Sequence, residues 1–170
     1  MHVTTLDTIF GALNAAGVRY LVAGGLAVNA HGYLRLTCDL DLVITLDRGN
    51  IQAFFAALVG IGYRPRVPIE ARQFAEPTQR ATWREEKGMQ VLSFYCEQHR
   101  DTAIDVFIEE PFDFSTEYTR AMRGALLPGL EVPFVALETL IRMKEAADRP
   151  KDRDDVVHLR WILEQRQSHE

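Results

Sequence analysis

Two aspartates stand two positions apart in a segment that has the pattern of a β-strand. Asp39 and Asp41 alternate with apolar residues in the run 39–44. Alternate residues of a strand point to the same face, so both carboxylates would share one surface, with Cα atoms on the order of 7 Å apart. Their neighbours Cys38, Leu40 and Leu42 carry no positive charge. Because two like charges this close repel each other, a divalent cation is a natural way to keep both ionised.

A third carboxylate lies within another segment that has the pattern of a strand. Asp105 interrupts the apolar run 103–108, where an aspartate is disfavoured. Its side chain would point away from the face of its apolar neighbours and would meet Asp39 and Asp41 if the two strands are adjacent. Three converging carboxylates form an all-oxygen site that suits Mg²⁺ or Mn²⁺. The alternative is that Asp39 and Asp41 face solvent and Asp105 forms a salt bridge.

A pair of glycines separates a short apolar segment, 20–23, from a predicted short helix, 26–30. The backbone N–H groups of Gly24 and Gly25, together with the N-terminus of the helix, could hold a phosphate, because no side chain blocks its approach. A plain turn from strand to helix explains an isolated glycine pair equally well. The position of this pair before the aspartate strand is what makes it a candidate.

Three polar or cationic residues are candidates for further phosphate contacts. Arg35 and Thr37 lie just before the aspartate strand, and they can equally be exposed turn residues. Lys144 falls on the apolar stripe of a predicted helix over 137–147, on the side that should be buried. It would contact a phosphate there, or its ammonium group would reach solvent or pair with Asp152 or Asp155.

The remaining charged clusters are interpreted as surface features. The segment 64–87 carries more Arg and Lys than Glu, and it could receive an acidic acceptor such as an RNA end, although a surface of mixed charge is the simpler interpretation. Arg149, Lys151 and Arg153 stand among aspartates at the expected start of the last helix, which is typical of a solvated helix N-terminus. None of the five histidines has the spacing of a zinc site.

Composition narrows the class of protein. The formal net charge of −5 argues against non-specific coating of nucleic acid, which depends on many Lys and Arg contacts to phosphate. No run of about 18 apolar residues and no signal-peptide pattern are present, so we expect a cytoplasmic protein without a membrane segment. In that compartment Cys38 and Cys96 are expected to be free thiols.

Hydrophobic periodicity predicts a mixed α/β (α+β) fold: a small mixed sheet flanked by helices and followed by a C-terminal helical pair. We expect one domain over residues 1–170, with a core over about 18–110 and a helical cap over about 134–167. The segments 91–96 and 103–108 should form an antiparallel hairpin. The remaining predictions are helices over 6–13, 50–60, 137–147 and 150–163, and one or two short helices within 64–90.

Taken together, these motifs resemble the polymerase-β-like nucleotidyltransferase superfamily. Its signature is a Gly-Gly or Gly-Ser turn, then an Asp-x-Asp strand, then a strand with a third Asp, and these match Gly24-Gly25, Asp39-x-Asp41 and Asp105. The stretch 22–32, followed by Arg35-x-Thr37 and the aspartate strand, is especially similar to the compact bacterial branch related to AbiEii toxins. The resemblance covers about 20–108 and, more loosely, the last two helices.

The resemblance implies a reaction and a role for each candidate residue. Asp39 and Asp41 would bind two Mg²⁺ or Mn²⁺ ions, Asp105 would help to activate the acceptor hydroxyl, and the glycine turn, with Lys144, would hold the triphosphate of an NTP such as ATP. Many members carry Ser where this chain has Gly25, so phosphate binding would depend more on the backbone and on cations such as Arg35.

The expected activity is transfer of a nucleoside monophosphate to an acceptor hydroxyl. The acceptor is left open among RNA such as tRNA, a protein and a small molecule such as an aminoglycoside, because a fold does not determine a substrate. A role in a toxin-antitoxin or phage-defence system, with a cognate protein partner, follows from the AbiEii resemblance. The alternative is a catalytically idle protein of the same fold that acts as an antitoxin or binding partner.

Overall fold

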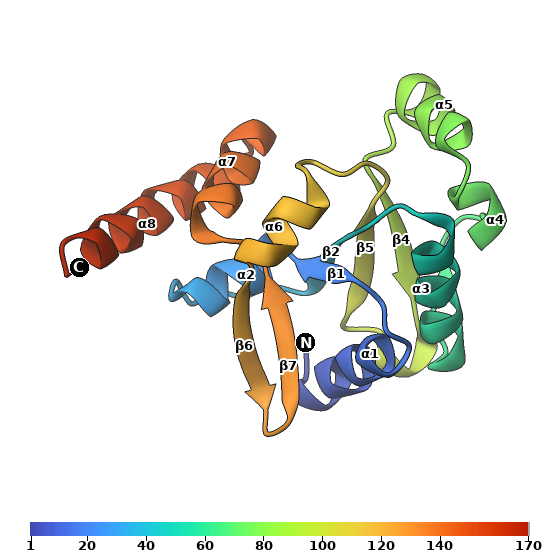
Figure 1. The fold of residues 1–170 in the computed structure, drawn as a ribbon, viewed down its shortest axis with the longest axis horizontal. Helices are drawn as coiled ribbons and strands as arrows, with labels where there is room; N and C mark the ends of the chain where they lie inside the picture. Colours follow the sequence, from blue (N-terminus) through green and yellow to red (C-terminus); the bar gives the residue numbers. More distant parts are fainter. Residues whose placement is uncertain (170) are drawn as a thin grey trace.

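One seven-stranded mixed sheet forms the centre of the computed structural model, which describes residues 1–169 (Figure 1). The strand order is β3-β4-β5-β2-β1-β7-β6. The strands are β1 (Tyr20–Val22), β2 (Asp39–Ile44), β3 (Arg64–Pro65), β4 (Val91–Tyr95), β5 (Ala103–Phe107), β6 (Met122–Leu127) and β7 (Leu130–Phe134).

Helices flank this sheet and follow it at the C-terminal end of the chain. They are α1 (Val3–Ala15), α2 (Gly24–His31), α3 (Arg48–Gly60), α4 (Ala71–Phe74), α5 (Pro77–Lys87), α6 (Phe114–Arg120), α7 (Leu137–Ala147) and α8 (Pro150–Gln167), with a 3-10 turn η1 at Glu97–His99. The mixed α/β fold with a C-terminal helical pair is confirmed. Across residues 1–169, no helix combines the length and the apolar character needed to cross a membrane.

The pairing of the strands brings the two aspartate segments together. β2 runs parallel to β5 and antiparallel to β1, and β4 pairs antiparallel with β5 as predicted. The register of β2 and β5 places Asp41 directly beside Asp105 and Asp39 beside Ala103. The expectation that the strand of Asp105 neighbours the strand of Asp39 and Asp41 is therefore confirmed.

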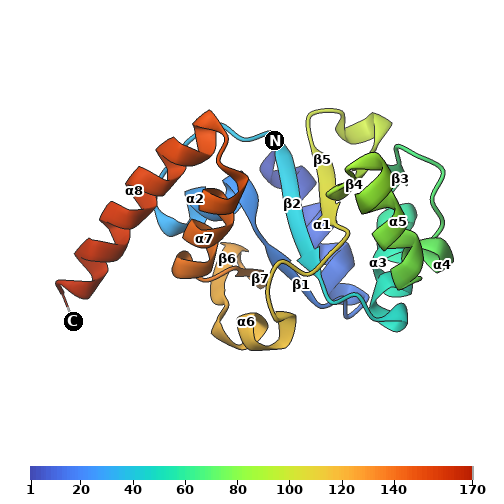
Figure 2. The ribbon, with the colours of Figure 1, turned by 90° about the horizontal axis from the view of Figure 1, so that it is seen from above.

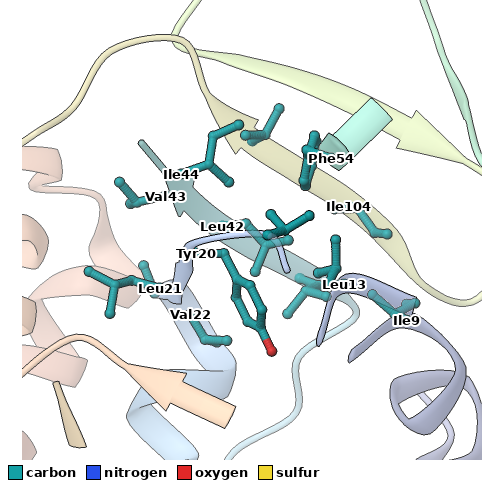
Figure 3. Close-up of a cluster of buried hydrophobic side chains, with 14 of the residues drawn as sticks. Ile9, Leu13, Tyr20, Leu21, Val22, Leu42, Val43, Ile44, Phe54 and Ile104 are labelled. Atoms are coloured by element: carbon teal, nitrogen blue, oxygen red, sulfur yellow. The ribbon is translucent and has the colours of Figure 1, made fainter. Parts of the chain in front are cut away.

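The core lies on the face of the sheet opposite to these aspartates. Leu42 and Ile104, which alternate with the aspartates, are fully buried against Ile9 and Leu13 of α1 and Phe54 of α3 (Figure 3). Burial of aliphatic and aromatic side chains is the main stabilising contribution to such a layer. This packing holds one face of β2 and β5 against the helices and leaves the carboxylates on the other.

Several boundaries differ from the sequence-based expectation. The helix after the glycine pair begins at Gly24 itself, and the last helix continues to Gln167. The sequence did not predict α6 or the β6–β7 hairpin, where Pro133 and several glycines weaken the strand pattern. Cys38 and Cys96 are free thiols, as expected.

Candidate active site

The face of β2 and β5 that carries the aspartates is flanked by helices rather than covered by α1, which lies behind the sheet in Figure 2. In that view α7 and α8 lie to one side of these strands and α5 to the other. Ser93 of β4 is the cross-strand neighbour of Asp105 and donates a hydrogen bond to its Oδ1. Strands β4, β5 and β2 therefore present Ser93, Asp105 and Asp41 in one row.

Asp41 is the most perturbed carboxyl group of this row. Burial, followed by the negative charge of Asp105, raises the pKa of Asp41 from 3.8 to about 6, against the opposing effect of Lys144. Asp39 raises this pKa further, and Lys151 lowers it. The fold thus holds a carboxylate that would be stabilised by an additional cation.

The glycine turn lies directly against Asp41. Gly24 has φ +61°, and a Cβ at that position would come 1.8 Å from Oδ2 of Asp41. The backbone N–H of Ala23 donates to the Asp41 carbonyl at 2.9 Å, which holds the turn and β2 together. A Cβ at Gly25 would approach Thr37 Oγ1 to 2.5 Å and Arg35 Nη1 to 3.1 Å. The first turn of α2 therefore meets the Asp41 carboxylate with backbone alone, and it brings Arg35 and Thr37 beside Gly25.

Gly24→Ala is expected to displace the Asp41 carboxylate and to lower any transfer activity more than about a hundredfold, since active-site misplacements of about 1 Å have effects of this size. Gly88→Ala is the matched control, because Gly88 has φ +62° and no atom within 4 Å of an added Cβ. Both variants should lose about 1–3 kcal/mol of unfolding free energy from backbone strain. Chemical denaturation and nucleotide-binding measurements on both variants would test this prediction. Equal losses of nucleotide binding in the two variants would contradict it.

Arg35 and Lys144 belong to one buried network of ion pairs that joins the two C-terminal helices to the loop before β2. Arg35 donates to both oxygens of Asp155, at 2.6 and 2.8 Å. Lys144 Nζ lies 2.9 Å from Asp155 and 3.0 Å from Asp152, and Arg149 also pairs with Asp152. Both aspartates are fully buried. Asp155 thereby holds the guanidinium group of Arg35 next to Gly25.

Of the alternatives that the sequence left open for Lys144, the structure shows the ion pair with Asp152 and Asp155. Burial disfavours ionisation of Asp152 and Asp155, but hydrogen bonds from Lys144 and from Arg149 or Arg35 outweigh burial and hold both pKa values below their ordinary range. Lys144 is therefore a partner of two carboxylates, and its charge also acts on Asp41. A contact between Lys144 and a triphosphate stays a prediction.

The sequence reasoning overlooked Lys151, which it assigned to a solvated helix start. Lys151 lies four residues before Asp155 on α8, so it shares the side of the helix that faces Arg35 and Asp41. Its neighbours Arg149 and Arg153 pair with Asp152 and Asp148, whereas no ion pair of Lys151 is found within residues 1–169. An exposed, unpaired lysine whose charge acts on Asp41 is a better candidate for a phosphate contact than Lys144.

The side chains present fit a hard divalent cation in part. Asp41 and Asp105 supply carboxylate oxygens from adjacent strands, which is the ligand type that Mg²⁺ and Mn²⁺ prefer. Asp39 shares their strand face but is more exposed, and the described part of the chain contains no group of three acidic, His or Cys side chains close enough to hold a metal ion. Asp41 and Asp105 are thus two candidate ligands on adjacent strands, and Asp39 is the third candidate.

Two of the six cationic side chains of the segment 64–87 pair with carboxylates among residues 1–169. Arg72 pairs with Glu70, and Arg84 pairs with Glu85 and Glu109. Arg80 is buried and donates to the Phe74 carbonyl. Arg72 and Arg84 therefore fit the mixed-charge interpretation of the segment, and an RNA-binding surface stays a prediction for the other cations.

Comparison of the fold with solved structures identifies the architecture. Lincosamide antibiotic adenylyltransferase LnuA, in its lincomycin-bound crystal structure, has a TM-score of 0.61 at 16% sequence identity, covering 92% of this chain and 95% of that chain. ANT(2″)-Ia in complex with adenylyl-2″-tobramycin has a TM-score of 0.57 at 15% identity, covering 92% and 86%. The chain has the nucleotidyltransferase fold. The solution structure of ANT(2″)-Ia agrees, with a TM-score of 0.55 at 15% identity over 98% and 93% of the two chains.

The nucleotidyltransferase fold was predicted from the motifs, and that prediction is confirmed. No protein-family model matches the chain, and no curated protein does. The AbiEii-type branch therefore stays a prediction. At 15–16% identity the solved structures establish a shared fold, and the reaction of this chain must be argued from its own residues.

Proposed function

We propose that this protein is a metal-dependent nucleotidyltransferase that transfers a nucleoside monophosphate from an NTP to a hydroxyl group of a small molecule. The observation that carries the proposal is the placement of Asp41 beside Asp105, with the backbone of Gly24 against the Asp41 carboxylate. A glycine turn at a helix N-terminus binds phosphate, and adjacent carboxylates bind the cation that accompanies a triphosphate.

Each part of the chain has a distinct task in this proposal. The N–H groups of the first turn of α2 hold the triphosphate, and Arg35, fixed by Asp155, adds a positive charge beside Gly25. Asp105 accepts the proton of the acceptor hydroxyl, while Ser93 fixes the orientation of its carboxylate. The acceptor oxygen forms a bond to the α-phosphorus, the bond to the bridging oxygen breaks, and pyrophosphate leaves.

Asp39 and Asp41, with Asp105, are the residues that would hold Mg²⁺ or Mn²⁺. When bound, this cation neutralises charge on the phosphates and on the carboxylates that otherwise repel each other. The raised pKa of Asp41 supports this assignment, because its main causes are burial and the charge of Asp105.

A small-molecule acceptor is proposed because of the chains of similar fold. They are a lincosamide antibiotic adenylyltransferase with bound lincomycin and ANT(2″)-Ia with adenylyl-2″-tobramycin. The role in a toxin-antitoxin or defence system that the AbiEii resemblance implies would instead require an RNA or protein acceptor.

Transfer can be tested with α-phosphate-labelled NTPs, Mg²⁺ and three acceptor pools: lincomycin with tobramycin, total RNA, and a protein extract. The wild-type chain should label a small molecule, and Asp41→Asn should label nothing. Label on RNA or protein would redirect the proposal towards the toxin-like role. If none of the NTPs raises the melting temperature of the wild type in the presence of Mg²⁺, the alternative of a catalytically idle binding protein explains the structure better.

Lys151→Gln is expected to weaken NTP binding about tenfold or more, the loss associated with one charge-assisted hydrogen bond of about 1.5–3 kcal/mol. Its unfolding free energy should stay near the wild-type value, because Lys151 is exposed. Arg153→Gln, two residues further along α8, removes the same charge from an exposed pair with Asp148 and serves as the control. Titration calorimetry on both variants would test this, and equal losses would remove Lys151 from the site.

A further inference from the structure

The face of the sheet that carries the aspartates continues beyond β4 to the edge of the sheet at β3. Ser93 of β4 pairs with Asp105 on one side, and on the other its carbonyl accepts the backbone N–H of Arg66 at 2.8 Å. The register of β3 and β4 thus continues one residue past β3 and sets Arg66 opposite Ser93. Directly opposite residues of paired strands point to the same face, so the row of Asp41, Asp105 and Ser93 extends to Arg66.

A contact of the Arg66 side chain agrees with this placement. Its Cζ atom lies 5.5 Å from the centre of the Tyr95 ring. Tyr95 comes two residues after Ser93 on β4, so it points to the same face, whereas Leu92 and Phe94 are buried on the core face. The interaction of the cation with the aromatic ring therefore holds the guanidinium group on the face of the aspartates.

The row is accessible to solvent between Asp105 and Arg66. Ser93 and Asp105 are partly exposed, and Arg66 is exposed, whereas the residues that alternate with Ser93 and Asp105 along β4 and β5 are buried. Neighbouring strands are about 4.8 Å apart, so Arg66 and Asp105, which are separated by β4, lie about 10 Å apart at the backbone. A single substituted ring on this face can therefore approach both side chains.

Arg66 brings an uncompensated positive charge to this face. Among residues 1–169 its side chain forms no ion pair and no hydrogen bond, and its contact is the ring of Tyr95. Arg64, two residues earlier, also lacks a carboxylate partner in this part of the chain, but it donates to the carbonyls of Val59 and Tyr63 at 3.0 and 2.9 Å. Of the two arginines at this edge, Arg66 is therefore the one whose donors are available to a ligand.

We propose that Arg66 selects the acceptor, a hydroxylated small molecule with a carboxylate or phosphate group, which binds with its anionic group at Arg66 and its hydroxyl at Asp105. The inference deepens the proposed function and rests on it for the identity of the ligand as an acceptor. A guanidinium group binds either oxyanion through two parallel hydrogen bonds. Tyr95 offers its ring to the body of the ligand. RNA is disfavoured, because a polyanion depends on many contacts from Lys and Arg.

Three probes with the same ring and hydroxyl group test the preference for charge: 4-(hydroxymethyl)benzoate, the neutral 4-(hydroxymethyl)benzamide and the cationic 4-(hydroxymethyl)benzylamine. A fourth, 4-(hydroxymethyl)phenyl phosphate, distinguishes phosphate from carboxylate. Binding in the presence of Mg²⁺ is followed by chemical-shift changes of the Arg66, Ser93 and Tyr95 amides. One of the two anions should bind about tenfold or more tightly than the benzamide and shift these amides.

Four results of this experiment would overturn the proposal. They are equal binding of the anions and the benzamide, tighter binding of the benzylamine, shifts confined to other residues, and no binding at millimolar concentration. A short 5′-phosphorylated RNA is measured in parallel. If it binds more tightly than every ring compound, the edge of the sheet is an RNA site and the small-molecule acceptor is wrong.

Arg66→Gln tests whether this arginine causes the preference. The variant should bind the anion and the benzamide equally, with an unchanged affinity for the benzamide, and it should fold as the wild type does because Arg66 is exposed. Arg72→Gln is the matched control, since it removes the same charge from an exposed pair with Glu70 in the same segment, and it should keep the preference. A preference that persists in Arg66→Gln would come from another cation, such as bound Mg²⁺, and would contradict the proposal.

Magnesium-dependent NTP binding, measured on the same variants, separates this inference from the proposed function. It should be unchanged in Arg66→Gln, since β4 and β5 lie between β3 and the strand of Asp41. A loss of NTP binding without a loss of benzoate binding would assign Arg66 to the nucleotide and overturn the inference. If NTP binds and no anion preference is found, only the inference fails. If the preference depends on Arg66 but no NTP binds, the proposed function fails, and with it the role of the anion as an acceptor.

Discussion

Asp41→Asn is expected to lower transfer more than about a hundredfold and, in chelator, to make the protein more stable than the wild type. Residues that only hydrogen-bond to the ligands of a metal site are worth about 10–100-fold in activity, so the loss of a direct ligand should exceed that range. Stability rises because the variant no longer buries an ionised carboxyl beside Asp105, whose charge helps to raise the Asp41 pKa to about 6.

The pH dependence of this effect has a definite sign. A carboxyl whose pKa is raised in the folded state binds more protons there than in the unfolded state, so it stabilises the fold at low pH. In the metal-free wild type this contribution should be complete below about pH 4 and lost as the pH rises through about 6. The rise of the Asp41 pKa from 3.8 to about 6 corresponds to about 3 kcal/mol as an upper bound, and Asp41→Asn should remove this dependence of stability on pH.

Urea denaturation in chelator at a series of pH values measures the difference between the two proteins. Asp101→Asn is the control, because Asp101 is an exposed residue of the turn before β5 and carries the same charge. The control should follow the wild-type pH profile. If Asp41→Asn were less stable than the wild type above pH 6, Asp41 would be a structural ion-pair partner and the cluster of repelling carboxylates would be excluded.

Lys144→Met is expected to have the largest effect on stability, a loss of about 3–5 kcal/mol. The substitution keeps the apolar stem but removes the ammonium group shared by Asp152 and Asp155, which are both fully buried. Arg149 and Arg35 still pair with these carboxylates, which places the expected loss near the lower end of the range.

Acid denaturation provides a second signature of this network. Hydrogen bonds hold the pKa values of Asp152 and Asp155 below their ordinary range despite burial, so their contribution is present above about pH 4 and is lost as the pH falls further. Lys144→Met should reduce this loss, whereas Lys151→Met should leave it unchanged. Unfolding curves that matched the wild type would contradict the structural role, and unchanged NTP affinity in folded Lys144→Met would remove Lys144 from the nucleotide site.

Local sequence was sufficient to identify the candidate carboxylates and the glycine turn. Strand periodicity put Asp39 and Asp41 on one face, and the cost of an aspartate within the apolar run of β5 singled out Asp105. These signals depend only on residues a few positions apart. For the same reason the β6–β7 hairpin escaped prediction, since Pro133 and Gly124 weaken the local pattern and strand pairing across the sheet supplies what it lacks.

What only the tertiary structure decided is how the charges meet. Sequence reasoning left Lys144 open between a phosphate and an aspartate, and packing of α7 against α8 pairs it with Asp152 and Asp155. The same packing leaves Lys151 unpaired among residues 1–169, on the side of α8 that faces Asp41. Local sequence thus determines which groups this protein has for binding phosphate and cations. Contacts between residues more than a hundred positions apart, such as Arg35 and Asp155, determine which of these charges form ion pairs within the fold and which remain unpaired. The reason is that electrostatic energy depends on the distance between charges and on their burial.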